Sequence, residues 1–233
     1  AAIVLGNRKG WPQVAMPPHN MTMTITGAGM LWVGWFGFNA GSALGANESA
    51  AMALIVTHLA AATGALTWMG LEWKKFGKPS ALGIVTGMVA GLGTITPASG
   101  FVSPAAAIII GFSAGIICFY ATLYMKQKLK IDDSLDVFPV HGVGGILGSL
   151  LVGLFCASGL GAFSGYGFGA DNTTIPEQLG TQLIAIGSVF AYTAIISWAI
   201  LKLVDKITGL HVDEEDESMG LDIALHEEKG YDL

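Results

Sequence analysis

Two histidines, His58 and His141, lie inside long apolar stretches of the sequence. An ionisable side chain within a membrane span is costly, so it usually faces the interior of a helix bundle or a water-filled path. At a helical rotation of about 100° per residue, His141 shares its half of the helix with small residues, namely Gly144, Gly145, Gly148 and Ser149. We therefore expect His141 to point into protein, either as a structural histidine bonded to a neighbouring helix or as a pore or relay group.

The same rotation places His58 on a face of small residues, which are Ala51, Ala61, Ala62 and Ala65. Small side chains let neighbouring helices approach closely, and polar side chains then bond across the contact. The favoured interpretation of His58 is therefore a structural histidine, hydrogen-bonded across a tight helix contact.

An aromatic ring and a hydroxyl share another helix face, at Phe38 and Ser42. The rest of this face is formed by Leu31, Gly34, Gly41 and Gly45. The negative face of an aromatic ring attracts a cation, and a hydroxyl oxygen accepts a hydrogen bond. This pair can therefore recognise a small cation. The competing interpretation is an ordinary aromatic belt at the membrane interface, which suits Trp35 and Phe36 in particular.

Other spacings predict packing and no enzymatic chemistry. Glycines that recur every four residues predict close helix contacts, at Gly83, Gly87 and Gly91 and at Gly111 and Gly115. Both cysteines, Cys118 and Cys156, lie inside apolar stretches and are predicted to be packing residues. The sequence shows no phosphate-binding loop, zinc-ligand spacing or nucleophile motif, so we expect no metal, no cofactor and no enzyme.

Membrane helices must position these side chains. Of the 233 residues, 52% are hydrophobic and 12% are charged, whereas a soluble domain carries about 25% charged residues. Six stretches with almost no charge are long enough to cross a hydrocarbon layer of about 30 Å as helices; they cover about 22–44, 50–71, 81–100, 104–125, 137–157 and 180–203. A β-barrel would instead show alternating strands of about ten residues. The predicted class is an all-α integral membrane protein with six complete spans, and residues 1–5 are expected to be the end of a preceding helix.

Charge distribution predicts the orientation. All 11 Lys and Arg residues fall on one side of the predicted membrane, and the opposite links hold only Glu48, Asp171 and Glu177. By the positive-inside rule, the basic side and the carboxyl-terminal tail are cytoplasmic, while the 158–179 link is external. The net charge of −6 comes mostly from the tail, where residues 213–217 are all acidic. The tail is interpreted as a solvated terminus, with a regulatory contact as the alternative.

Long ordered motifs spread over nearly the whole chain resemble those of a known family, the ammonium transporters of the Amt/Mep/Rh group, and are most similar to its bacterial and archaeal branch. The motifs are Gly34 to Ser42, Ala46-Asn47-Glu48, Gly77 to Ser80, Thr96 to Gly100, Asp132-Asp133, Asp136 to Gly145 and Gly220-Leu221-Asp222.

The resemblance implies an eleven-span fold, of which the six predicted spans match the sixth to eleventh. It implies a membrane domain at residues 1–206, a cytoplasmic tail at 207–233, and a chain that lacks the first five spans. It also implies a homotrimer in the cell membrane, with a narrow apolar pore through each subunit. The substrate would be ammonium or ammonia, with methylammonium as an analogue, and a PII-type signal protein is an implied cytoplasmic partner.

By this resemblance, Phe38 matches one ring of an external gate, Ser42 the hydroxyl of an outer ammonium site, and His141 the second histidine of a pore pair. Leu31, Trp35 and Val137 complete the pore candidates. Asp136 matches a carboxylate near the inner end of its helix, and Gly220, Leu221 and Asp222 belong to a structural or regulatory motif in the tail. His58 does not match the first pore histidine, and the tail departs from the family pattern at His226-Glu227-Glu228.

The function that the resemblance implies is cation recruitment and deprotonation at the outer mouth, followed by passage of ammonia through the apolar pore. The main alternative is an ammonium sensor that signals through a cytoplasmic partner. An intramembrane enzyme that uses His141 as a base is a third class, and the sequence offers no nucleophile or metal ligands for it.

Overall fold

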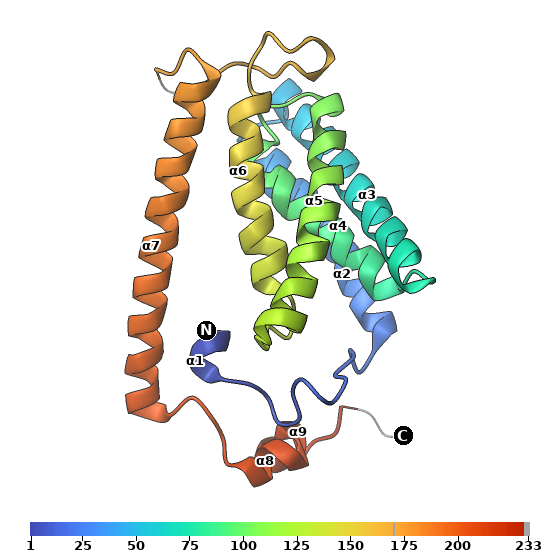
Figure 1. Ribbon diagram of the computed structural model, residues 1–233, viewed down its shortest axis with the longest axis vertical. Helices are drawn as coiled ribbons and strands as arrows, with labels where there is room; N and C mark the ends of the chain where they lie inside the picture. The colour runs from blue at the N-terminus through green and yellow to red at the C-terminus, as the bar shows by residue number, and fades with distance from the viewer. Residues whose placement is uncertain (170, 231–233) are drawn as a thin grey trace.

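The computed structural model describes residues 1–169 and 171–230, and these residues form helices and loops without any strand. The helices run roughly alongside one another, with α7 set apart from the others (Figure 1). Their bounds are α1 (Ala2–Leu5), α2 (Met21–Gly41), α3 (Glu48–Phe76), α4 (Ala81–Ile95), α5 (Pro104–Tyr124), α6 (Val143–Phe155), α7 (Ile175–Thr208), α8 (Glu214–Met219) and α9 (Leu221–His226).

Capping side chains explain where several helices begin. Asn47 and Ser80 accept hydrogen bonds from backbone N–H groups of the first turns of α3 and α4, at 3.0 and 2.8 Å. Thr174 forms a capping box with Glu177 at the start of α7. Each cap satisfies an N–H group that the helix itself leaves unpaired. These polar residues therefore end the loops and fix the helix starts.

Helices form at all six predicted spans, and the all-α membrane class is confirmed. Five of them are long and apolar enough to cross a membrane: Glu48–Phe76, Ala81–Ala98, Pro104–Leu129, Phe138–Phe155 and Ile175–Thr208. The remaining helix, α2, has 21 residues and would reach about 31 Å. Threonines, glycines and Asn39 interrupt its hydrophobic residues.

Glycines bring α3, α4 and α5 into backbone contact, as their four-residue spacing predicted. A Cβ atom placed on Gly91 of α4 or on Gly111 of α5 would collide with the backbone of Ala60 in α3. Gly64 of α3 meets the backbone of Gly87 in the same way. The core of the bundle therefore lies between these three helices, where Val56, Ala60, Ile95 and Ile110 are fully buried.

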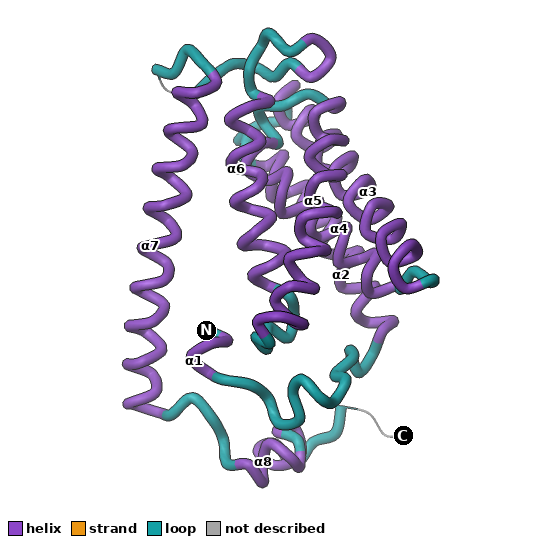
Figure 2. The backbone as a smooth tube through the Cα atoms, viewed as in Figure 1, coloured by secondary structure: helices purple, strands orange, loops and turns teal. Residues whose placement is uncertain are grey.

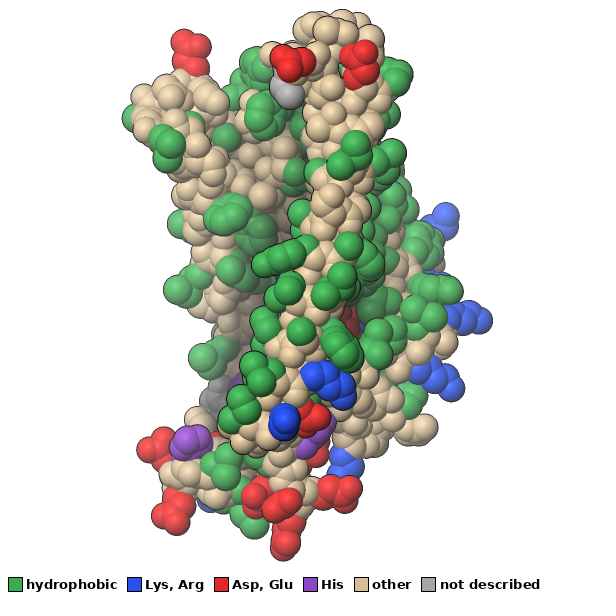
Figure 3. Space-filling model, turned by 90° about the vertical axis from the view of Figure 1, so that its left-hand side faces the viewer, with side chains coloured by type: hydrophobic (Ala, Val, Ile, Leu, Met, Phe, Trp, Pro, Cys, Tyr) green, Lys and Arg blue, Asp and Glu red, His purple; other side chains and the backbone are tan. Residues whose placement is uncertain are grey.

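Helix α7 contacts the remainder of the chain mainly near its beginning, where Leu179 and Gln182 lie against Gly153 of α6. No residue of its apolar stretch is buried within the chain. Figure 3 shows hydrophobic side chains along its length, with charged side chains at its two ends. This pattern suits a helix whose surface is covered by lipid or by other protein.

The amino-terminal segment and the tail helices α8 and α9 lie together at one end of the bundle (Figure 2). Residues 2–5 form the single helical turn α1, and α7 continues to Thr208 before the chain turns toward α8. Residues 231–233 of the predicted tail and residue 170 of the predicted external link lie outside the described residues. The division at residue 206 stays a prediction.

Candidate functional site

A hollow of about 260 Å³ lies at the carboxyl end of α2. Phe38 and Ser42 both line it, as the shared helix face predicted, and Ser99 of the turn after α4 lines the opposite side. The Phe38 ring is 65% exposed, so one face of an aromatic ring borders open space. The hollow therefore combines an accessible ring with hydroxyl groups.

The hydroxyl of Ser42 donates to the backbone carbonyl of Phe38, at 2.9 Å. Because its proton is engaged, the oxygen presents lone pairs, and these can only accept hydrogen bonds from a visitor. Behind the hollow, the buried Asn39 amide donates to Thr57 Oγ1 at 2.9 Å, and Thr57 donates to the carbonyl of Ala53. This chain of hydrogen bonds fixes α2 against α3, so the position of the hollow is set by a buried polar contact.

Trp35 connects the hollow to His141. Its ring meets Phe38 edge-on with centroids 6.2 Å apart, and lies nearly parallel to His141 at 6.3 Å with an interplanar angle of 11°. Its Nε1 atom donates to Thr96 Oγ1 at 2.8 Å. Trp35 is thus part of a continuous row with two other predicted site residues and is not an isolated belt residue. Sequence reasoning missed Thr96 as its partner, although Thr96 begins one of the quoted motifs.

His141 lies in a π-turn, Phe138–Gly142, which precedes α6. The expectation that its ring points into protein stays a prediction, because His141 is exposed in this chain while its ring borders Trp35 and Gly93. The buried side of the helix is instead formed by Gly144 and Gly148, which pack on Thr94 of α4. Gly93 borders the ring, because a Cβ atom there would lie 3.8 Å from its Nδ1 atom. His141 therefore lines an open face together with Trp35.

His58 departs from its prediction. Ala61 on the same face is buried, but His58 itself is exposed. Its ring stacks on Trp32 with centroids 5.2 Å apart and an angle of 27°, and lies 6.0 Å from the Phe36 ring. Among the described residues, the contacts of His58 are with aromatic rings and not with a hydrogen-bonding partner. Sequence reasoning missed Trp32, because rotation within one helix does not show which side chain of the next helix it meets.

Two further pore candidates follow the same open face. Leu31, one turn before Trp35, is 53% exposed, and Val137, one turn before His141, is 51% exposed. Spacing of four residues puts each on the same side of its helix as the ring that follows. The structure thus exposes Leu31, Phe38, Val137 and His141 on α2 and around the start of α6, with the partly buried Trp35 between Phe38 and His141.

The predicted carboxylate, Asp136, lies at the inner end of this row. Its Oδ2 atom forms an ion pair with Lys126 Nζ at 2.7 Å. Burial raises the pKa of the Asp136 carboxyl, and the hydrogen bond from Lys126 opposes that rise. Lys126 is a functional candidate that the sequence did not single out, since it was counted only among the basic residues at the membrane edge.

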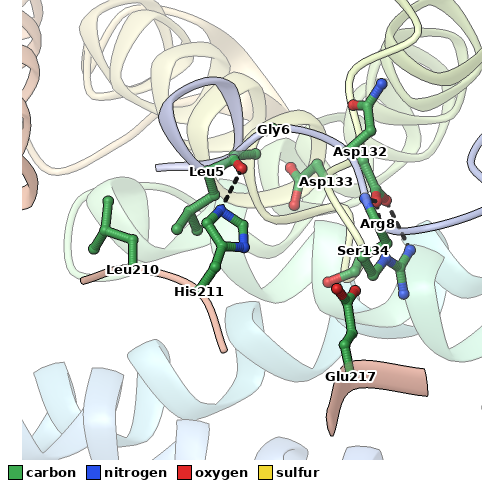
Figure 4. A pocket seen from close by; sticks show the side chains of 11 residues that line it. Leu5, Gly6, Arg8, Asp132, Asp133, Ser134, Leu210, His211 and Glu217 are labelled. Atoms are coloured by element: carbon green, nitrogen blue, oxygen red, sulfur yellow. Dashed lines mark hydrogen bonds and ion pairs between the residues drawn. The ribbon is translucent and has the colours of Figure 1, made fainter. Parts of the chain in front are cut away.

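A second hollow, of about 410 Å³, lies where the tail meets the amino-terminal segment (Figure 4). Arg8 makes two hydrogen bonds with the Asp132 carboxylate, at 2.7 and 2.9 Å from its side chain. These bonds hold the pKa of Asp132 below its usual range. From the tail, the His211 ring lies 2.8 Å from the carbonyl oxygen of Leu5. The tail is therefore in contact with the amino-terminal segment.

The tail motif follows Glu217, which lines this hollow. Gly220 separates α8 from α9 with a φ of 97°, a conformation that glycine adopts without strain. Leu221 and Asp222 begin α9, and the carbonyl of Asp222 accepts a hydrogen bond from the N–H of Glu228. Lys9 also donates to Ser218 at 2.9 Å. The motif thus shapes the turn that returns the tail toward the amino-terminal segment.

Comparison with known proteins decides the family. The family model described as Ammonium Transporter Family matches residues 1–231. The chain belongs to the ammonium transporter family. Ammonium transporter Amt1 of Archaeoglobus fulgidus is 44% identical over 99% of this chain and 57% of its own length. An ammonium transporter of Aquifex aeolicus is 45% identical over the whole chain and 53% of its own length.

Solved structures of the ammonium transporter family agree in fold. A structure titled Sensor Amt Protein superposes with a TM-score of 0.83 at 30% identity, over 97% of this chain and 54% of that chain. Mep2 of Saccharomyces cerevisiae gives a TM-score of 0.78 at 37% identity, over 92% of this chain and 49% of that chain. The chain thus spans about half the length of the relatives that it matches, and the described helices form part of the ammonium transporter fold.

Proposed function

We propose that this chain supplies one wall of a pathway for ammonium and ammonia across a membrane. The observation that carries the proposal is the row of rings Phe38, Trp35 and His141, which leads away from the hydroxyl-lined hollow at the end of α2. Family membership supports ammonium as the substrate. The row connects a place where a cation can be held to an ionisable ring within an apolar surface.

Recruitment begins at the hollow. Ammonium is a cation with N–H donors, so it gains from the face of the Phe38 ring and from the lone pairs of Ser42. These contacts replace part of its hydration shell. Because Ser42 already donates to Phe38, its oxygen is oriented to accept. The hollow therefore favours a small donor cation over an anion.

Passage beyond the hollow requires loss of a proton. A bare ion in a dry, narrow path has a large desolvation cost, whereas neutral ammonia does not. We propose that ammonium gives up a proton to a water molecule in the hollow near Phe38 and that ammonia then passes Trp35 and His141. The imidazole of His141 can donate a hydrogen bond to ammonia or accept one from it. Potassium carries a charge similar to that of ammonium but has no proton to lose. It therefore stays an ion and is excluded from the dry, narrow path.

Assembly and orientation are proposed together with this function. We propose a homotrimer in the cell membrane, with the tail in the cytoplasm and available to a PII-type signal protein. The exposed apolar surface of α7 and the basic residues at one side of the bundle support the proposal. The likeness to a structure titled Sensor Amt Protein does not favour a sensor over a transporter.

Uptake of methylammonium into proteoliposomes tests the function, with the longest natural polypeptide that contains these residues. Phe38→Ala should weaken apparent affinity by about 2- to 30-fold, since a cation–π contact contributes about 0.5–2 kcal/mol. His141→Ala should lower the rate while leaving expression unchanged, because the ring is exposed and its loss creates no buried cavity.

Phe36→Ala is the matched control, since Phe36 lies on the same helix but against His58 and away from the hollow. It should leave apparent affinity unchanged. Equal transport defects in Phe36→Ala and Phe38→Ala at equal protein amounts would contradict the assignment of the hollow. Wild-type rates and selectivity in His141→Ala would make His141 a structural residue.

A further inference from the structure

Two π-turns flank the segment 130–137 in the sequence. One, Met125–Leu129, directly follows α5. The other, Phe138–Gly142, contains His141 and directly precedes α6. Such turns insert an extra residue into a helix and are frequent at functional sites. Lys126, in the first π-turn, forms an ion pair at 2.7 Å with Asp136, two residues before the second, and the side-chain exposures are 33% and 18%. The pair therefore connects α5 to the residues immediately before His141.

The carboxylate of Asp136 is not needed to cap the helix that follows. Asp133 performs that role, because its Oδ2 atom accepts the N–H of Phe138 at 2.7 Å. Asp136 instead adopts a φ of 55°, an uncommon conformation for a residue with a side chain. Its Oδ1 atom is buried and has no hydrogen-bond partner in the part of the chain that the structure describes. Among the described residues, Lys126 is thus the side chain that bonds this carboxylate, through its Oδ2 atom.

The position of the His141 ring depends on this turn. The ring stacks on Trp35, and its backbone belongs to the turn that starts two residues after Asp136. The carbonyl of Asp136 accepts the N–H of Val140 at 3.0 Å, so any shift of Asp136 is passed to the residue next to His141. A small displacement in a pathway that depends on ring alignment has a large effect on rate.

We propose that Lys126 and Asp136 are a positioning pair for His141, an inference that rests on the proposed function. The ion pair holds the π-turn so that the imidazole stays parallel to Trp35 and at the open face. The pair acts on the rate of passage and not on recruitment, because the hollow with Phe38 and Ser42 is formed by other elements, at the far end of the row.

Transport by purified, reconstituted protein tests the pair, with rates expressed per folded molecule. Lys126→Met should lower the maximal rate of methylammonium uptake by about 3- to 10-fold, which is well within the loss of about 10²-fold that a 1 Å misplacement can cause. Its apparent affinity should stay at the wild-type value. The double exchange Lys126→Asp with Asp136→Lys should recover part of the rate.

Lys128→Met is the matched control, since Lys128 lies in the same π-turn, is exposed, and forms no ion pair among the described residues. It should transport as the wild type does. A wild-type protein that does not transport methylammonium would overturn the proposed function itself. If the wild type transports, an unchanged rate per molecule in Lys126→Met, or the same loss in Lys128→Met, would overturn the positioning pair.

Discussion

Replacing Gly91 with alanine should weaken the contact between α3 and α4. A Cβ atom at this position would lie 2.8 Å from the carbonyl carbon of Ala60 and 3.0 Å from the Cα atom of Ala61, and closer still to the carbonyl oxygen of Ala60. All three are backbone atoms of a buried helix, so none can rotate away. The two helices would have to separate to make room for the methyl group, and this separation would remove the close packing around Gly91.

The magnitude follows from two opposing effects. Overpacking a close contact costs about 1–3 kcal/mol. Alanine also favours a helix over glycine by about 0.8–1.0 kcal/mol, which offsets part of that cost. Gly70 of α3 provides the matched control, because no atom lies within 4 Å of a Cβ placed there. Both variants gain the helix preference, so the free energy of unfolding of Gly91→Ala should be lower than that of Gly70→Ala by about 1–3 kcal/mol.

Equilibrium unfolding of the purified protein in detergent, followed by circular dichroism, measures this difference. Gly111→Ala collides with the same residue, Ala60, from α5. The double variant should therefore be less destabilised than the sum of the single variants, because one movement of α3 relieves both collisions. Equal stability of Gly91→Ala and Gly70→Ala would refute the reasoning.

The remaining predictions concern charge. Because Arg8 lowers the pKa of Asp132, the stability gained from this pair should be present above the ordinary aspartate pKa of about 4 and lost as pH falls through the depressed value. The thermal unfolding midpoint of the wild type should thus fall more between pH 7 and pH 3 than that of Asp132→Asn, and equal falls would contradict the effect of the pair. For topology, a membrane-impermeant maleimide should label Asp171→Cys in intact cells and Lys128→Cys only after permeabilisation; the reverse pattern would overturn the orientation.

Hydropathy and glycine spacing predicted much of the fold. Lengths of apolar sequence identify membrane helices because the bilayer imposes one thickness on all of them. The glycine spacing at Gly87 and Gly91 predicted close packing because the absence of a side chain is useful only where another backbone approaches. Polar caps such as Ser80 set the helix starts, although the exact ends were less accurate. Helix α3 continues to Phe76, five residues beyond the predicted span.

The faces of the two histidines were less predictable. Rotation about one helix gives the relative directions of its own side chains, but not the neighbour that covers each direction. For His141, the glycines on its half of the helix have different surroundings. Gly144 is buried, whereas no atom lies within 4 Å of a Cβ placed on Gly145. For His58, Trp32 of the preceding helix decided the contact. Such contacts depend on crossing angles, which one helix alone does not determine.

The packed core and the candidate pathway use different elements of the bundle. Small residues such as Ala60 and Gly91 fill the buried contacts of α3 with α4 and α5, where there is no room for a pathway. Of the residues suited to ammonium, Phe38 and His141 are exposed on α2 and in the turn before α6, and Trp35 between them is partly buried. An ionisable ring left against lipid is costly, so this surface requires a protein partner or a water-filled space. The tight core therefore holds the open face in place, and a substitution can damage either one while leaving the other intact.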